Sequence, residues 1–155
     1  MTREIERKFL ILDLPRNIKD YTSYEINQGY LVITDNIEFR LRRKNVKYYQ
    51  TIKTGQGLTR GEYEIELSSV QFDLLWPLTE GKRVEKTRYE IRDKSSIIEL
   101  DIYRGPLKGL ITAEVEFNSK QASNKFQPPQ WFGKEITLDS RYKNKNLSLL
   151  RIPPS

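Results

Sequence analysis

The strongest constraint on the fold is an alternation of charged and apolar residues with a period of two. In the segment 36–44, NIEFRLRRK, charged side chains fall on even positions from 38 to 42 and apolar ones on odd positions from 37 to 41. Successive side chains of a β-strand point to opposite faces, so this pattern predicts strands with one charged and one apolar face. Similar patterns predict eight strands, in the segments 4–11, 24–33, 36–44, 46–54, 61–68, 83–92, 96–105 and 110–118.

Signals for helices are fewer than those for strands. The segment 68–78 begins with serines and carries Phe72, Leu75 and Trp76 at helical spacing, which predicts a helix. Shorter helical segments are predicted at 118–126 and 144–152. Short turn-like stretches join several of the strands. The sequence therefore predicts a single domain, residues 1–155, that is mainly β (α+β), with an antiparallel barrel or strongly curved sheet and a few helices.

Two absences from the composition limit the chemistry of any site. The chain contains no Cys, which excludes disulfides, thiolate nucleophiles and cysteine-based metal sites. It also contains no His, which removes the commonest general base and any metal site built on imidazole. A metal would have to be held by oxygen ligands, which favours Mg²⁺, Mn²⁺ or Ca²⁺.

The charge balance points to an anionic partner. The net charge is +6 and the isoelectric point is near 9.4. Charge of this sign suits a nucleotide, a polyphosphate, a nucleic acid or an acidic membrane surface. No apolar run approaches the roughly 18 residues of a membrane span, and the first residues are already charged, unlike a secretory signal. We therefore expect a cytoplasmic protein with no membrane partner.

The charges on the predicted strands are segregated by sign. A solvated face is the simplest interpretation of any one strand, but such a face usually mixes signs because like charges repel. Here carboxylates dominate 62–66 and 114–116, and cations dominate 40–42 and 86–88. A metal–phosphate complex needs both signs, since carboxylates bind the metal while Arg and Lys bind phosphate. If such a site lines a tunnel, the apolar residues face outward against the helices.

A series of motifs in a fixed order carries a family resemblance. EIERKF at 4–9 resembles the ExExK signature of the CYTH superfamily, also called triphosphate tunnel metalloenzymes. The resemblance continues through FRLRR, TIK, EYEIEL, EKTRY, ELDIY, AEVEF and GKEITLDSRYKN, and spans nearly the whole chain. It implies a closed eight-stranded antiparallel β-barrel with a charged tunnel that binds triphosphate compounds together with Mg²⁺ or Mn²⁺.

The resemblance also implies roles for individual residues. The carboxylates at matching positions are implied as metal-binding or supporting groups, and the cations as phosphate-binding groups. NQGYL at 27–31 resembles the segment that carries a tyrosine working with the lysine of ExExK, which implies a catalytic pair of Lys8 and Tyr30. The implied metal set is Glu4, Glu6, Glu114 and Glu116, supported by Glu62, Glu64 and Asp101, and the implied substrate-binding set is Lys8, Arg40, Arg42, Lys53, Lys86, Arg88 and Lys134.

Three functions compete at this point. The chain resembles the short bacterial branch of the superfamily, which implies metal-dependent hydrolysis of tripolyphosphate. A class IV-type adenylyl cyclase uses the same tunnel, but the sequence offers no evident purine pocket. A non-catalytic module for polyphosphate or nucleotide is the third alternative. Nucleic acid is disfavoured as a partner because the carboxylates on the same faces would repel its backbone, and a homodimer is left open.

Overall fold

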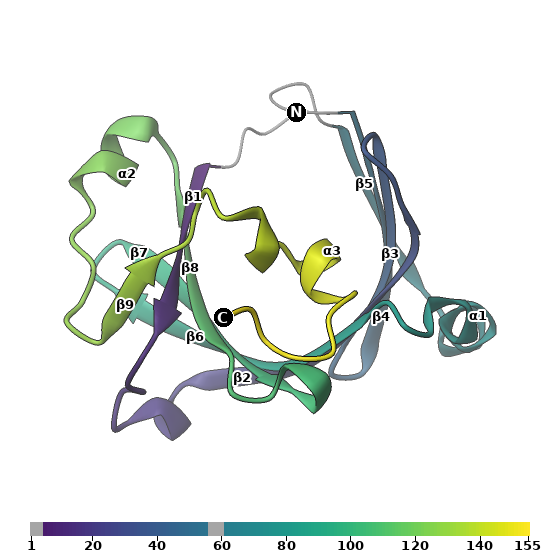
Figure 1. Ribbon diagram of the computed structural model, residues 1–155, viewed down its shortest axis with the longest axis horizontal. Coiled ribbons are helices and arrows are strands. Elements are labelled where there is room, and N and C mark those ends of the chain that lie inside the picture. Colours follow the sequence, from purple (N-terminus) through teal and green to yellow (C-terminus); the bar gives the residue numbers. More distant parts are fainter. Residues whose placement is uncertain (1–4, 56–60) are drawn as a thin grey trace.

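One curved antiparallel sheet makes up most of the computed structural model, which describes residues 5–55 and 61–155 (Figure 1). Each of the eight predicted strands is present, which confirms the mainly β architecture. A ninth strand, which the sequence analysis missed, follows near the C-terminal end. The strands are β1 (Ile5–Ile11), β2 (Thr22–Ile33), β3 (Ile37–Lys44), β4 (Lys47–Thr54), β5 (Gly61–Leu67), β6 (Arg83–Asp93), β7 (Ser96–Arg104), β8 (Ile111–Phe117) and β9 (Phe132–Glu135).

The sheet is open, so the prediction of a closed eight-stranded barrel was wrong. Its strand order is β5-β4-β3-β2-β6-β7-β8-β1-β9, with β5 and β9 as the two edges. Closure would require β5 to pair with the far end of the sheet. There, β9 has only four residues and pairs with β1. Strand periodicity predicts which face a side chain takes, but closure depends on pairing between strands far apart in the chain.

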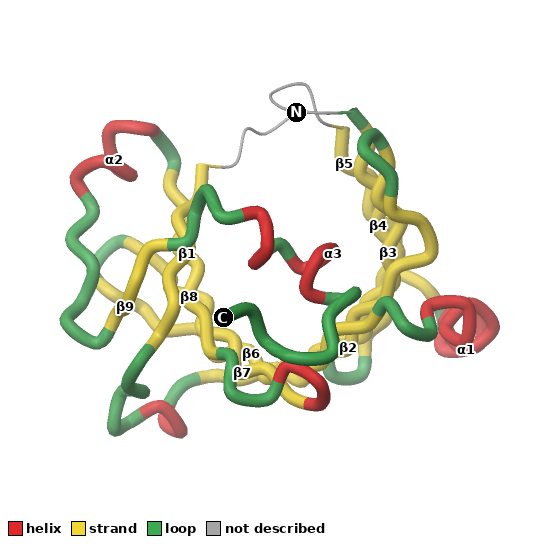
Figure 2. The backbone as a smooth tube through the Cα atoms, in the orientation of Figure 1, coloured by secondary structure: helices red, strands yellow, loops and turns green. Residues whose placement is uncertain are grey.

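The helices are short and lie on both sides of the sheet. α1 (Ser69–Leu75) begins with a capping box at Ser68 and lies on the convex side, as does α2 (Lys120–Lys125) (Figure 1). α3 (Asn144–Leu147) lies inside the curve of the sheet with the segment around it (Figure 2). Single 3-10 turns are η1 (Ile18–Asp20), η3 (Trp76–Thr79), η4 (Gly105–Leu107) and η5 (Ser140–Tyr142). None of the helices in the described ranges is long and apolar enough to cross a membrane.

The apolar side chains form separate clusters on the two sides of the sheet. On the convex side, Leu100 and Val115 belong to one cluster, and Leu41 packs with Phe72 of α1 in another. The outward apolar face is covered only in part, because Tyr63 and Ile65 of β5 are 66% and 55% exposed. The apolar residues face outward as expected, and α1 packs against one part of that face.

A third cluster lies on the concave side and fixes the C-terminal segment. Tyr142 and Leu147 pack there with Val84 of β6 and Tyr103 of β7. Leu147 has no exposed surface and Tyr142 is 5% exposed. Apolar burial of this kind anchors α3 inside the curve of the sheet, next to the charged side chains of the strands.

Candidate active site

The concave side of the sheet encloses a strongly charged cavity of about 510 Å³. The eight strands β1 to β8 and the C-terminal segment contribute to its wall, and most of the side chains that line it are ionisable. The lining residues are Glu6, Lys8, Gln28, Tyr30, Glu38, Arg40, Arg42, Lys44, Lys53, Glu62, Lys86, Arg88, Glu99, Glu114, Glu116, Ile136, Thr137, Asp139, Tyr142, Lys143, Asn144 and Lys145.

Most of the predicted site residues are brought together on this wall. Strand register explains why, because side chains directly opposite each other on paired strands share a face. Tyr30 of β2 faces Arg40 of β3, and Lys8 of β1 faces Glu114 of β8. The predicted residues on the wall are Glu6, Lys8, Tyr30, Arg40, Arg42, Lys53, Glu62, Lys86, Arg88, Glu114 and Glu116.

Three predicted site residues that the structure describes are not among those that line the cavity, and a fourth cannot be placed. Lys134 is exposed on β9. Glu64 of β5 is exposed, and its Oε2 accepts a hydrogen bond of 2.8 Å from Thr51. Asp101 is buried behind the wall at 1% exposure. Glu4 lies outside the described residues.

The arginines of β3 carry buried nitrogen atoms that lack partners. The Nε atoms of Arg40 and Arg42 are buried and have no hydrogen-bond partner within residues 5–55 and 61–155. Burial, together with the charges of Arg40 and Arg88, lowers the pKa of Arg42 to about 10, although Glu64 opposes the shift. A buried donor without an acceptor is costly. This part of the wall is therefore prepared to receive an anion.

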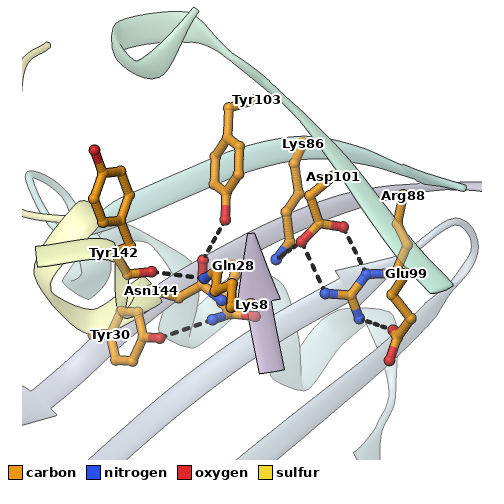
Figure 3. A network of polar contacts seen from close by, with 10 residues as sticks. All are labelled: Lys8, Gln28, Tyr30, Lys86, Arg88, Glu99, Asp101, Tyr103, Tyr142 and Asn144. Carbon is orange, nitrogen blue, oxygen red and sulfur yellow. Dashed lines mark hydrogen bonds and ion pairs between the residues drawn. The ribbon is translucent and has the colours of Figure 1, made fainter. Parts of the chain in front are cut away.

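Two cations of β6 are held by a buried carboxylate of β7 (Figure 3). Lys86 Nζ donates to Asp101 Oδ2 at 2.8 Å, and Arg88 Nε donates to Asp101 Oδ1 at 2.8 Å. A further contact joins Arg88 to Glu99. Burial alone would raise the pKa of Asp101, but the charges of Arg88 and Lys86 bring that pKa well below its usual value. Burial lowers the pKa of Lys86 to about 8, although Asp101 opposes this shift.

Three carboxylates of β1 and β8 form the acidic part of the wall. Glu6 faces Glu116 across the strand pair, and the Glu6 carboxyl lies within hydrogen-bond reach of Glu114. Burial opposes ionisation of Glu114, but that contact and the charges of Lys8, Lys86 and Arg88 leave its pKa below the usual value. No three carboxylates of the described chain are grouped as a ready-made metal centre. The oxygen donors fit a hard divalent cation, and Glu4, the fourth predicted ligand, is not described.

The predicted catalytic pair lies where the C-terminal segment meets the sheet (Figure 3). Lys8 Nζ donates a hydrogen bond of 2.6 Å to the backbone carbonyl of Tyr142. The Tyr30 hydroxyl accepts a bond of 2.8 Å from Gln28 Nε2, and burial raises the pKa of Tyr30. Neither bond joins Lys8 to Tyr30, but each side chain is on the cavity wall.

Several lining residues were missed by the sequence analysis. Gln28, Glu38 and Glu99 belong to strands whose inward parity was already evident, so the same alternation could have found them. Lys145 of α3 could not be found in this way, because it reaches the cavity from the C-terminal segment. Its Nζ lies 3.4 Å from Glu38 Oε1, and Asn144 accepts a hydrogen bond of 2.9 Å from the Tyr103 hydroxyl.

Comparison with known proteins is consistent with this arrangement. A family model described as the CYTH domain matches residues 2–151. The chain belongs to the CYTH domain family. It is 49% identical over 148 residues to an inorganic triphosphatase of Nitrosomonas europaea, covering 94% of this chain and 97% of that protein. It is 35% identical over 150 residues to an inorganic triphosphatase of Acetivibrio thermocellus, covering 95% and 94% of the two chains.

A solved structure of a CYTH relative has the same fold. The crystal structure of an inorganic triphosphatase superposes with a TM-score of 0.79 at 47% sequence identity. The match covers 99% of each chain. The curved sheet and its charged concave side are therefore set in a fold that this relative shares over its whole length.

Proposed function

We propose that the protein is a metal-dependent inorganic triphosphatase that removes a terminal phosphoryl group from tripolyphosphate. The observation that carries this proposal is the pair of buried Nε atoms of Arg40 and Arg42 on a cavity wall, which have no hydrogen-bond partner in the described part of the chain. Such donors lack an acceptor, the side chains that carry them line the cavity, and arginine matches phosphate oxygens in geometry as well as charge. The names of the two relatives, each an inorganic triphosphatase, support the same substrate.

The distribution of cations around the cavity suits an extended polyanion. Lys8, Arg42 and Lys86 come from β1, β3 and β6, so cations approach the cavity from different directions. A substrate with several phosphates can contact these strands at once. The proposed phosphate contacts are Lys8, Arg40, Arg42, Lys53, Lys86 and Arg88, with Lys145 added from the C-terminal segment.

We place the metal beside the acidic part of the wall. Glu6, Glu114 and Glu116 would hold Mg²⁺ or Mn²⁺, with Glu4 as a further predicted ligand and Glu62 as a supporting carboxylate. When bound, such a cation offsets the negative charge of the phosphate oxygens. These carboxylates would hold the metal and would repel phosphate oxygens that the metal does not neutralise, so the triphosphate would be oriented toward the basic side chains of the wall.

Lys8 and Tyr30 are proposed to act on the attacking water and the terminal phosphoryl group. The raised pKa of Tyr30 means that its hydroxyl keeps its proton at neutral pH, so it can orient water by hydrogen bonding. The hydrogen bond to the Tyr142 carbonyl places the amine of Lys8 in the cavity wall, where its charge can stabilise the transferring phosphoryl group.

The alternative functions have less support from the cavity. A cyclase must also seat adenine, yet the aromatic side chains lining the described part of the cavity, Tyr30 and Tyr142, are 1% and 5% exposed. They offer little open ring surface for stacking. A pure binding module shares the cations of the site but would release no phosphate.

Two substitutions test the proposal directly. Lys8→Ala and Glu116→Ala should each abolish metal-dependent release of orthophosphate from tripolyphosphate while circular dichroism shows an intact fold. Arg7→Ala is the matched control for Lys8, because Arg7 pairs with Glu135 rather than lining the cavity. Normal turnover in both cavity variants would contradict the proposal.

A substrate panel separates the three functions. Tripolyphosphate, ATP, GTP and thiamine triphosphate are assayed with Mg²⁺ and with Mn²⁺, and the products are identified. We expect orthophosphate and pyrophosphate from tripolyphosphate. Cyclic AMP with pyrophosphate from ATP would identify a cyclase, and tight binding without turnover would identify a binding module.

Cellular location and oligomeric state stay predictions within this proposal. We propose a cytoplasmic enzyme, to be checked by fractionation of cells that express the tagged protein. A homodimer is tested by light scattering coupled to size-exclusion chromatography of the purified chain.

A further inference from the structure

Asp101 differs from the other carboxylates that the sequence assigned to metal. Glu6, Glu114 and Glu116 line the cavity, whereas Asp101 is 1% exposed and lies behind Lys86 and Arg88. We propose that Asp101 is a positioning residue that holds Lys86 and Arg88 ready for phosphate, and that it does not bind the metal. This inference rests on the proposed function, since it concerns the binding of tripolyphosphate.

The hydrogen bonds of Asp101 leave little capacity for a metal ion. Its Oδ1 accepts from Arg88 Nε at 2.8 Å, and its Oδ2 accepts from Lys86 Nζ at 2.8 Å and from Arg88 Nη2 at 3.0 Å. An ionised carboxylate has about four acceptor sites, so three are in use. A metal at Asp101 would have to displace these donors and would leave the buried ammonium of Lys86 without its counter-charge.

The same bonds give the two cations fixed positions on the wall. Lys86 is 2% exposed and Arg88 is largely buried, so neither side chain is held by water. Their long side chains have many rotamers, and ordering them costs conformational entropy. Asp101 orders both before the substrate arrives, while Glu99 fixes the outer end of Arg88. Both residues line the cavity, where pre-organised cations bind an anion at lower cost.

The two possible roles of Asp101, metal ligand and positioning residue, predict different changes in the metal-free affinity for tripolyphosphate when Asp101 is replaced. Tripolyphosphate is titrated into the protein by calorimetry in EDTA, so that no metal is present and no hydrolysis occurs. If Asp101 were only a metal ligand, Asp101→Asn would remove one negative charge and leave metal-free anion binding unchanged or stronger. If Asp101 positions Lys86 and Arg88, the same variant binds tripolyphosphate about tenfold more weakly, the loss expected for disrupting charged hydrogen bonds.

The matched control is a carboxylate in an ion pair outside the cavity. Glu25 accepts from Arg104 at 2.7 Å and is half exposed, so Glu25→Gln removes a similar charge without touching the site. Its tripolyphosphate affinity should equal that of the wild type within about twofold, because its charge is screened by solvent. Circular dichroism and thermal melts confirm that each variant is folded.

A second pair of variants keeps the test valid if Asp101→Asn fails to fold. Lys86→Met removes the buried ammonium together with its demand for a partner, so the double variant with Asp101→Asn leaves fewer unpaired charges. The proposal predicts that the double variant binds tripolyphosphate more weakly than Lys86→Met alone, because Arg88 has also lost its orienting carboxylate.

Unchanged or stronger metal-free binding in Asp101→Asn, or in the double variant relative to Lys86→Met, overturns the positioning role. Failure of the wild type to release orthophosphate from tripolyphosphate with Mg²⁺ or Mn²⁺ counts against the proposed function, and the two failures are thereby distinguished.

Discussion

Two parts of the cavity wall treat their cations in opposite ways. On β6 and β7, Lys86 and Arg88 are bound by a buried carboxylate, Asp101. On β3, the Nε atoms of Arg40 and Arg42 are buried without a partner in the described ranges. The wall of β6 and β7, here called the paired wall, is satisfied by the protein itself. On the β3 wall, the two Nε donors have no acceptor in the described part of the chain, and a ligand can supply one. The difference indicates that the paired wall mainly holds its cations in fixed positions before the ligand binds. The β3 wall mainly offers buried donors that gain a hydrogen-bond acceptor when an anion binds.

The largest expected effect is loss of stability on breaking the paired wall. Asp101→Asn should lower the free energy of unfolding by about 3–5 kcal/mol, since it leaves two buried cations without their counter-charge. Urea denaturation monitored by circular dichroism measures this loss, with Glu25→Gln as the control. The pKa of Asp101 is far lower in the folded protein than in the unfolded chain, where it is about 4. The stabilisation that its ionised carboxylate provides is therefore fully present above about pH 4 and is lost only in strong acid. A neutral effect on stability would remove the distinction between the two walls.

The opposite pattern is expected for the β3 wall. Arg42→Met should lower kcat/KM for tripolyphosphate by about a hundredfold, the usual loss for one donor to a developing anion. Its stability should stay the same or rise, because the substitution removes a buried charge that Arg40 and Arg88 repel. Arg43→Met is the control, since Arg43 is on the other face and donates to the Asn45 carbonyl. Equal loss of stability in Arg42→Met and Asp101→Asn would break the comparison.

The pH dependence of binding sharpens the comparison further. The pKa of Lys86 is lowered to about 8, so its ammonium is charged below that pH and loses its proton above it. Metal-free affinity for tripolyphosphate should therefore fall by about tenfold as the pH rises from 7 to 9, a change worth roughly 1.4 kcal/mol. Titration calorimetry at several pH values measures the fall, and Lys86→Met should abolish most of it. The free energy of unfolding should change in the opposite direction and rise between about pH 8 and 10.5. The reason is that Lys86 binds its proton less tightly in the folded protein than in the unfolded chain.

The smallest expected effect concerns the C-terminal segment. Tyr103→Phe removes the hydrogen bond to Asn144 and thereby loosens the segment whose Tyr142 carbonyl holds Lys8. One neutral hydrogen bond contributes about 1 kcal/mol, so we expect a drop of about fivefold in kcat. KM should change little, because the paired cations stay in place. A steady-state assay with tripolyphosphate separates the two constants, and a selective rise in KM would contradict this role.

The sequence predicted the faces of the strands better than the connections between them. Alternation placed Arg40 and Arg42 on the same side as Lys86, because parity is a local property of each strand. It could not separate Asp101 from Glu114, since both have inward parity and only the neighbouring side chains decide which carboxylate is covered. It also missed the open sheet and Lys145, because both depend on contacts between distant segments.

The hydrogen bond from Lys8 to Tyr142 has a consequence for folding kinetics. It joins residues 134 positions apart, and β1 likewise pairs with β8 and β9, which come more than 100 residues later. Contacts with large sequence separation form slowly, because the intervening chain must first lose much of its freedom. We therefore expect folding on the millisecond-to-second scale, with the hairpins of β2 to β5 ordered before β1 docks. The cavity gains its lysine at position 8 only when the two ends of the chain meet.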